Sequence, residues 1–221
     1  MNSCLVIPLN TTADQTARLE ALQTAFAEVC NALGPVVREK RCWHRVTLHH
    51  LTYHALRERF PRIGSQMICN AIYSVCRTSR QVYQNPASPF CVSKRPEAPL
   101  PLIRFAPSAP VYFDRHTLSI KNGKLSMYTL DGRMRFQLDL KVEDLGRFHN
   151  EKLREIVLSQ SAGGYRLSFM FQSPDATDEL REPDASGDLP EYLIVLPERD
   201  LPVIRENSSG DMPLAMAALV A

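Results

Sequence analysis

The chain has 221 residues, of which 44% are hydrophobic, so it can bury a core in one domain or two small ones. It has no apolar run long enough to span a membrane. Its first residues do not show a basic segment followed by a long apolar segment, so we expect a cytoplasmic protein without a signal peptide. The net charge of +2 is unevenly spread, since residues 1–172 hold 23 Lys/Arg against 13 Asp/Glu and residues 173–221 hold 3 against 11. A basic body favours a polyanionic partner.

The first 85 residues are predicted to form one strand followed by helices. Residues 4–9 are apolar and have the length of a short buried strand. Apolar residues then recur at three- and four-residue spacing, which predicts helices at about 13–33, 45–59 and 64–83. We expect Gly34 and Pro35 to end the first of these helices. Residues 11–85 are therefore interpreted as a helical insertion after the first strand.

The region that follows changes from proline-rich to alternating. Seven prolines fall within residues 85–110, which predicts an irregular linker over residues 86–99. The pairs Asn122-Gly123 and Asp131-Gly132 separate alternating runs, which is typical of a three-stranded meander with tight turns. Residues 142–152 are a candidate short helix, and a second hairpin is expected around residues 162–164.

Together these elements predict an α+β fold. Residues 1–10 and 100–172 are expected to form a small antiparallel β-barrel, with the helical bundle inserted after its first strand. Residues 173–221 are expected to be an acidic, linker-like tail with one possible strand at 192–196.

Motifs that would indicate catalysis, a metal or a cofactor are missing. His50 and His54 share a helix face, but Leu-Thr-Tyr stands between them in place of the Glu-x-x of a zinc protease. None of the six cysteines forms a Cys-x-x-Cys pair, and no serine lies in Gly-x-Ser-x-Gly. The sequence contains neither of the glycine-rich motifs that bind nucleotide phosphates, Gly-x-x-x-x-Gly-Lys-Ser/Thr and Gly-x-Gly-x-x-Gly. We therefore expect no catalytic residue, metal or cofactor.

Basic residues with interleaved aromatic residues are the strongest functional signal. Any single exposed cation can simply be solvated, but here two adjacent modules are both basic, which is typical of nucleic-acid binding. The predicted nucleic-acid-binding residues of this kind are Arg38, Lys40, Arg41, Arg45, Tyr53, Arg57, Arg59, Arg62, Arg77, Arg80, Lys121, Lys124, Arg133 and Arg135.

Two stretches of the chain resemble a known family. Residues 51–66, LTYHALRERFPRIGSQ, with residues 70–75, NAIYSV, resemble the helical recognition segment of TnpB-type transposon proteins. These are RNA-guided nucleases related to type V CRISPR effectors. Residues 111–120, VYFDRHTLSI, and 125–133, LSMYTLDGR, are similar to the wedge domain of the same family. The resemblance covers roughly residues 4–172.

The resemblance implies that the barrel holds a structured guide RNA while the helices face the guide–target duplex and a short DNA motif beside it. Contacts to base edges need short polar side chains on a helix that reaches a groove. Ser65, Gln66 and Asn70 are the candidates, the alternative being a helix cap at Ser65 and ordinary exposed polar residues. The implied partners are a guide-like RNA and target DNA.

The family continues into a ribonuclease H-like nuclease domain whose first strand ends in Gly-x-Asp. Here residues 192–196 are followed by Pro-Glu-Arg-Asp-Leu-Pro, and Glu198 and Asp200 alone cannot form a two-metal site. We therefore expect a nuclease-deficient protein that acts as an RNA-guided repressor or as a subunit of a larger effector complex. The alternatives are a subunit of a split nuclease whose catalytic domain is a separate chain, an RNA-independent DNA-binding regulator, and a degenerate remnant.

Overall fold

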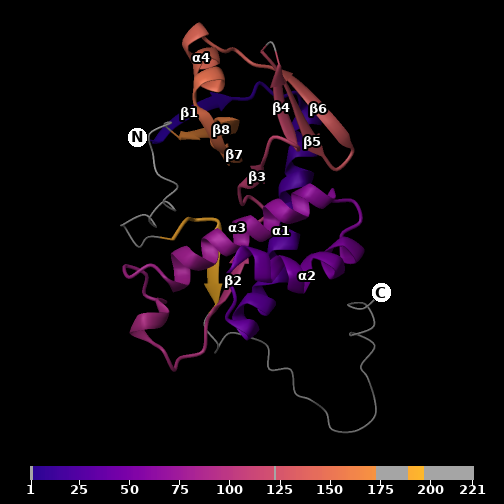
Figure 1. Cartoon of the computed structure of the whole chain (residues 1–221). Helices are drawn as coiled ribbons and strands as arrows, with labels where there is room; N and C mark the ends of the chain where they lie inside the picture. The colour runs from indigo at the N-terminus through magenta and orange to yellow at the C-terminus, as the bar shows by residue number, and fades with distance from the viewer. Residues whose placement is uncertain (1, 122, 173–188, 197–221) are drawn as a thin grey trace.

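The computed structural model describes residues 2–121, 123–172 and 189–196. This part of the chain contains four α-helices and nine strands. In Figure 1 the helices formed by residues 13–83 lie below the strands formed by residues 118–137 and 152–172, whereas the helix at residues 142–150 lies at the top. The helices are α1 (Ala13–Lys40), α2 (Arg45–Arg59), α3 (Ser65–Tyr83) and α4 (Val142–Asn150). The strands are β1 (Asn2–Pro8), β2 (Leu102–Phe105), β3 (Val111–Phe113), β4 (Leu118–Lys121), β5 (Lys124–Thr129), β6 (Gly132–Gln137), β7 (Lys152–Ser161), β8 (Gly164–Gln172) and β9 (Leu193–Leu196).

Helix α1 is longer than the sequence predicts. It begins with a capping box in which Thr12 and Gln15 satisfy each other's backbone N–H groups. The predicted end at Gly34 is wrong, because the helix runs through Pro35 to Lys40. Gly34 is needed for packing rather than for a turn, since a Cβ atom there would lie 2.9 Å from the carbonyl oxygen of Ile103 in β2. The helix ends where Arg41 adopts the left-handed conformation (φ 46°).

The strands form three antiparallel sheets, and the prediction of a barrel is wrong. The first sheet has the order β1-β8-β7-β3, the second pairs β2 with β9, and the third is the meander β4-β5-β6. Within the described residues none of these sheets closes on itself. The meander pairs only with its own neighbours in sequence, so the tight turns that form it also leave it separate from the four-stranded sheet. The α+β class is confirmed.

Two short strands that the sequence did not predict lie inside and directly after the proline-rich stretch 85–110. Strand β2 pairs with β9, and β3 pairs with the central part of β7. The predicted strand at 192–196 is therefore present as β9, and its partner lies about ninety residues earlier in the chain.

No helix of the described part is both long and apolar enough to cross a membrane. One cluster of buried side chains continues from the helices into all three sheets.

Candidate nucleic-acid interface

The meander exposes one face that is rich in cations. Its strands alternate, so Leu125, Met127, Met134 and Phe136 are buried on one side. The opposite side, which we call the meander face, carries Ser119, Lys121, Lys124, Ser126, Tyr128, Arg133, Arg135 and Gln137. Four of these eight residues are Lys or Arg and none is Asp or Glu. All four cations come from the sequence-predicted set.

Three of the four cations on the meander face have side chains without a partner in the described part of the protein. Among the described residues, no hydrogen bond or ion pair involves the side chains of Lys121, Lys124 or Arg135. Lys121 and Lys124 lie directly opposite each other on paired strands, an arrangement that costs the sheet stability unless an anion offsets it. Arg133 lies along the sheet instead, donating to the carbonyl oxygens of His116 at 2.8 Å and Ser126 at 3.2 Å.

Tyr128 joins the meander face to the start of α3. A Cβ atom on Gly64, the residue before α3, would lie 3.0 Å from the Cζ and hydroxyl oxygen of Tyr128, so a larger residue there would press against the ring. Gln66 donates to the carboxylate of Asp114, and Arg62 pairs with Asp131 at 3.3 Å on the surface. The stretches 51–66 and 111–133 are therefore in direct contact. The exposed Ser65 begins the helix at this junction.

A second basic region surrounds the turn between α1 and α2. We call it the turn patch, and it consists of Arg38, Lys40, Arg41, Arg45 and Arg80. Arg41 donates to the carbonyl oxygens of Pro96 and Ala98, which fixes its guanidinium against the proline-rich loop. The Arg45 guanidinium lies 5.4 Å from the ring centroid of Tyr73. Lys40 pairs with Glu39 on the surface, where such a pair adds little stability.

Helix α2 presents a row of rings to the outside that the sequence analysis did not identify as one unit. Tyr53 stacks on His49 with ring centroids 4.6 Å apart and meets His54 edge-on. Residues four apart on a helix are neighbours, so the spacing of His49 and Tyr53 was the available signal. At the end of the helix, Arg57 donates to the carbonyl oxygen of Ile63 and Arg59 lies over Phe60. Arg57 therefore organises the α2–α3 turn.

One predicted nucleic-acid-binding residue, Arg77, is half-buried and paired within the protein. Its Nη1 lies 2.6 Å from both carboxylate oxygens of Glu155 in β7, and the hydroxyl of Tyr73 donates to the same carboxylate at 2.9 Å. Burial alone would lower the pKa of Arg77. The electrostatic attraction of Tyr112 and Glu155 is stronger than this effect, so the pKa of Arg77 is raised. The structure thus gives Arg77 a packing role between α3 and β7.

The expected base-edge contacts also need correction. Asn70 is only 7% exposed, because its position on α3 faces the core, and its amide lies near the sulfur of Met67. Gln66 is half-buried, and its side-chain amide already donates a hydrogen bond to the carboxylate of Asp114. Of the three candidates, Ser65 alone is exposed in this conformation.

The described residues hold no cluster suited to binding a metal ion. In residues 2–121, 123–172 and 189–196, no three His, Cys, Asp or Glu side chains are grouped so that they could hold a metal ion. All six cysteines are free thiols, and burial raises the pKa of Cys76 to about 11. Glu198 and Asp200 lie outside the described residues. No protein-family model matches the chain, and no curated protein is significantly similar to it.

Proposed function

We propose that the protein binds nucleic acid on the meander face and the turn patch and does not itself break a covalent bond. The observation that carries this proposal is a sheet face with four cations, one tyrosine and no carboxylate. Lysine and arginine on such a face match the regular negative charge of a phosphate backbone. The ring of Tyr128, half-buried among them, adds an apolar surface on which a base can stack.

The proposed ligand is a structured, guide-like RNA, which the protein presents to target DNA as a repressor or as part of a larger effector complex. Support comes from the family-like stretches at residues 51–66 and 111–133, which pack together through the Gly64–Tyr128 and Gln66–Asp114 contacts. The proposal rests on these packed stretches and not on a closed wedge barrel, because the sheets are open.

The first experiment is to purify the protein from its host and sequence the RNA that remains bound. One abundant structured RNA supports the guided form of the proposal. Protein that is free of RNA but binds a specific DNA duplex would replace it with an RNA-independent regulator. Protein that binds neither would contradict the proposed function altogether.

The second experiment removes the free cations of the meander face. The triple variant Lys121→Ala/Lys124→Ala/Arg135→Ala should bind the RNA at least about tenfold more weakly, because it loses three contacts to phosphate groups. Each lost contact should also make the affinity less dependent on salt concentration. Fluorescence anisotropy over a range of salt concentrations should show the slope of log affinity against log salt reduced by about 2.

The matched control removes three exposed cations from other strands, Arg104→Ala/Lys152→Ala/Arg166→Ala. This variant loses the same net charge, so it separates local contacts from general attraction. Equal weakening in the two triple variants would argue against a specific role for the meander face.

A second candidate function is a subunit of a split nuclease. Strand β9 pairs with β2 along one edge, and among the described residues its other edge pairs with no strand, while Ile194 is 49% exposed. An open edge of this kind can accept a strand from a partner. If a natively purified complex cleaves DNA with added Mg²⁺ and the isolated chain does not, Ile194→Asp should abolish cleavage while RNA binding remains.

A further inference from the structure

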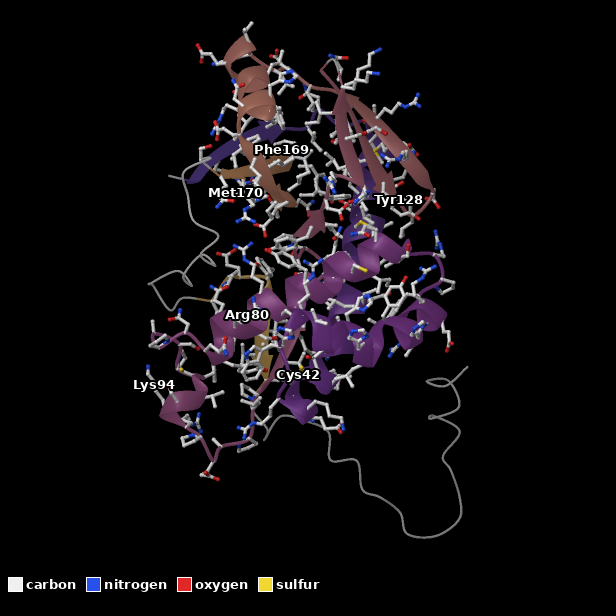
Figure 2. The ribbon with its side chains drawn as sticks, in the orientation of Figure 1. Cys42, Arg80, Lys94, Tyr128, Phe169 and Met170 are labelled. Atoms are coloured by element: carbon white, nitrogen blue, oxygen red, sulfur yellow. The ribbon has the colours of Figure 1, made fainter. Side chains whose placement is uncertain are left out.

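A pocket lies beside the turn patch, at the opposite end of α3 from the meander face. It has a volume of about 350 Å³ and is lined by Arg41, Cys42, Trp43, His44, Arg80 and Gln84. In Figure 2, Cys42 and Arg80 lie in the lower, helical half of the molecule and Tyr128 lies in the upper sheet. The volume is at the lower end of the range for pockets that hold small molecules.

The pocket combines an aromatic wall with positive charge. Trp43 is half-buried and packs against the buried ring of Tyr83, with ring centroids 5.3 Å apart and an angle of 42° between the planes. Tyr83 is fixed in turn, because its hydroxyl donates to the carbonyl oxygen of Pro101 at 2.7 Å. The indole is therefore held in place before any ligand binds, which reduces the entropy lost on binding.

The two guanidinium groups of the pocket differ in how they are held. Arg41 is fixed by its bonds to the loop carbonyls of Pro96 and Ala98. Arg80 is half-buried, and its side chain forms no hydrogen bond or ion pair with any residue that the structure describes. The six lining residues include no carboxylate. An anion that enters would meet Arg80 as a free, strong and potentially bidentate donor.

We propose that this pocket binds one nucleotide of a single-stranded nucleic acid, with the base against Trp43 and the phosphate on Arg80. The amide of Gln84, which caps α3 and is exposed, can donate to or accept from the base edge. This inference rests on the proposed function and deepens it, because it assigns unpaired nucleotides to the turn patch. Arg80 is fifteen residues beyond Ser65 on α3, which places the pocket about 22 Å from the meander junction.

The single tryptophan makes a direct test possible. Trp43 is the one tryptophan of the chain, so tryptophan fluorescence reports on this pocket without labelling. We expect adenosine 5′-monophosphate to quench this fluorescence with a saturable curve. Adenosine should bind at least about fivefold more weakly and inorganic phosphate should give little quenching, because each lacks one half of the ligand.

Arg80→Ala should raise the AMP concentration at half-saturation about tenfold, as expected for the loss of one charge-assisted contact. Since the Arg80 side chain has no protein partner among the described residues, this variant should fold normally, and its circular dichroism should match the wild type. Arg95→Ala, an exposed cation on the neighbouring loop, is the matched control and should leave the curve unchanged.

The same titrations separate this inference from the proposed function. The meander triple variant should lose RNA affinity while its AMP quenching stays unchanged. Saturable RNA binding without AMP quenching, or equal quenching in the wild type and Arg80→Ala, would overturn the pocket and leave the meander interface intact.

Discussion

The two basic regions of this protein carry their charge in different ways. On the meander face, strand alternation alone exposes the cations, and three of the four have no protein partner among the described residues. On the helices, some cations are used by the fold and others are not. Arg77 is bound by Glu155, whereas Arg80, one turn later on α3, has no such partner among the residues that the structure describes. Charge on a strand face is therefore easier to interpret than charge on a packed helix.

The largest expected effect distinguishes these two arginines. Arg77→Ala should lower the free energy of unfolding by about 2 kcal/mol, because it leaves the carboxylate of Glu155, only 12% exposed, without its cation. Urea unfolding followed by circular dichroism measures this loss.

Arg80→Ala is the control and should change the free energy of unfolding by less than about 0.5 kcal/mol. Replacing both members of the pair, Arg77→Met/Glu155→Gln, should recover part of the stability. If Arg77→Ala were as stable as the wild type, the structural role assigned to Arg77 through Glu155 would be wrong.

A smaller effect concerns the contact that positions the turn patch. Gly34→Ala should destabilise the protein by about 1 kcal/mol, although alanine favours helices, because its Cβ would meet the backbone of β2 at Ile103. Thermal unfolding measures the change.

Pro35→Ala, at the adjacent exposed position, should instead stabilise α1 by restoring a backbone donor inside the helix. Stabilisation by both substitutions would show that α1 does not lie against β2 in solution.

The last expected effect appears only at alkaline pH and concerns Cys76, which directly precedes Arg77 on α3 and lies one turn before Arg80. Burial raises the pKa of this thiol to about 11, and Arg80 opposes the shift. Because the folded pKa lies above the unfolded value, the stabilisation is complete below about pH 8.5 and is lost as pH rises toward 11. Urea midpoints should fall less steeply between pH 8.5 and 10.5 in Cys76→Ala than in the wild type. Parallel declines would contradict a buried, neutral thiol.

Local signals in the sequence predicted most of the elements. Helix α2 has the bounds expected from its apolar spacing, and the turns of the meander contain the expected glycines, with φ of 72° at Gly123 and 93° at Gly132. The end of α1 was missed because Gly34 serves a close approach to β2 rather than a helix cap. Strands β2 and β3 were missed because they are short, each directly follows a proline, and both depend on partners far along the chain.

The candidate site was predictable to a similar extent. Alternation identifies Lys121, Lys124 and Arg135 as exposed cations without any structure. Nothing local to Arg77 indicates that Glu155, 78 residues away, binds it, and the barrel prediction failed for the same reason. Long-range pairing decides both, and a single sequence does not display it.

The most direct test of the proposed nucleic-acid interface is ultraviolet crosslinking of the protein in the presence of its co-purified RNA, followed by mass spectrometry of the crosslinked peptides. Crosslinks should concentrate in the peptides that contain Tyr128 and Trp43, and the meander triple variant should lose the former at the same RNA concentration. Crosslinks confined to α4, β7 or β8 would contradict the interface described above.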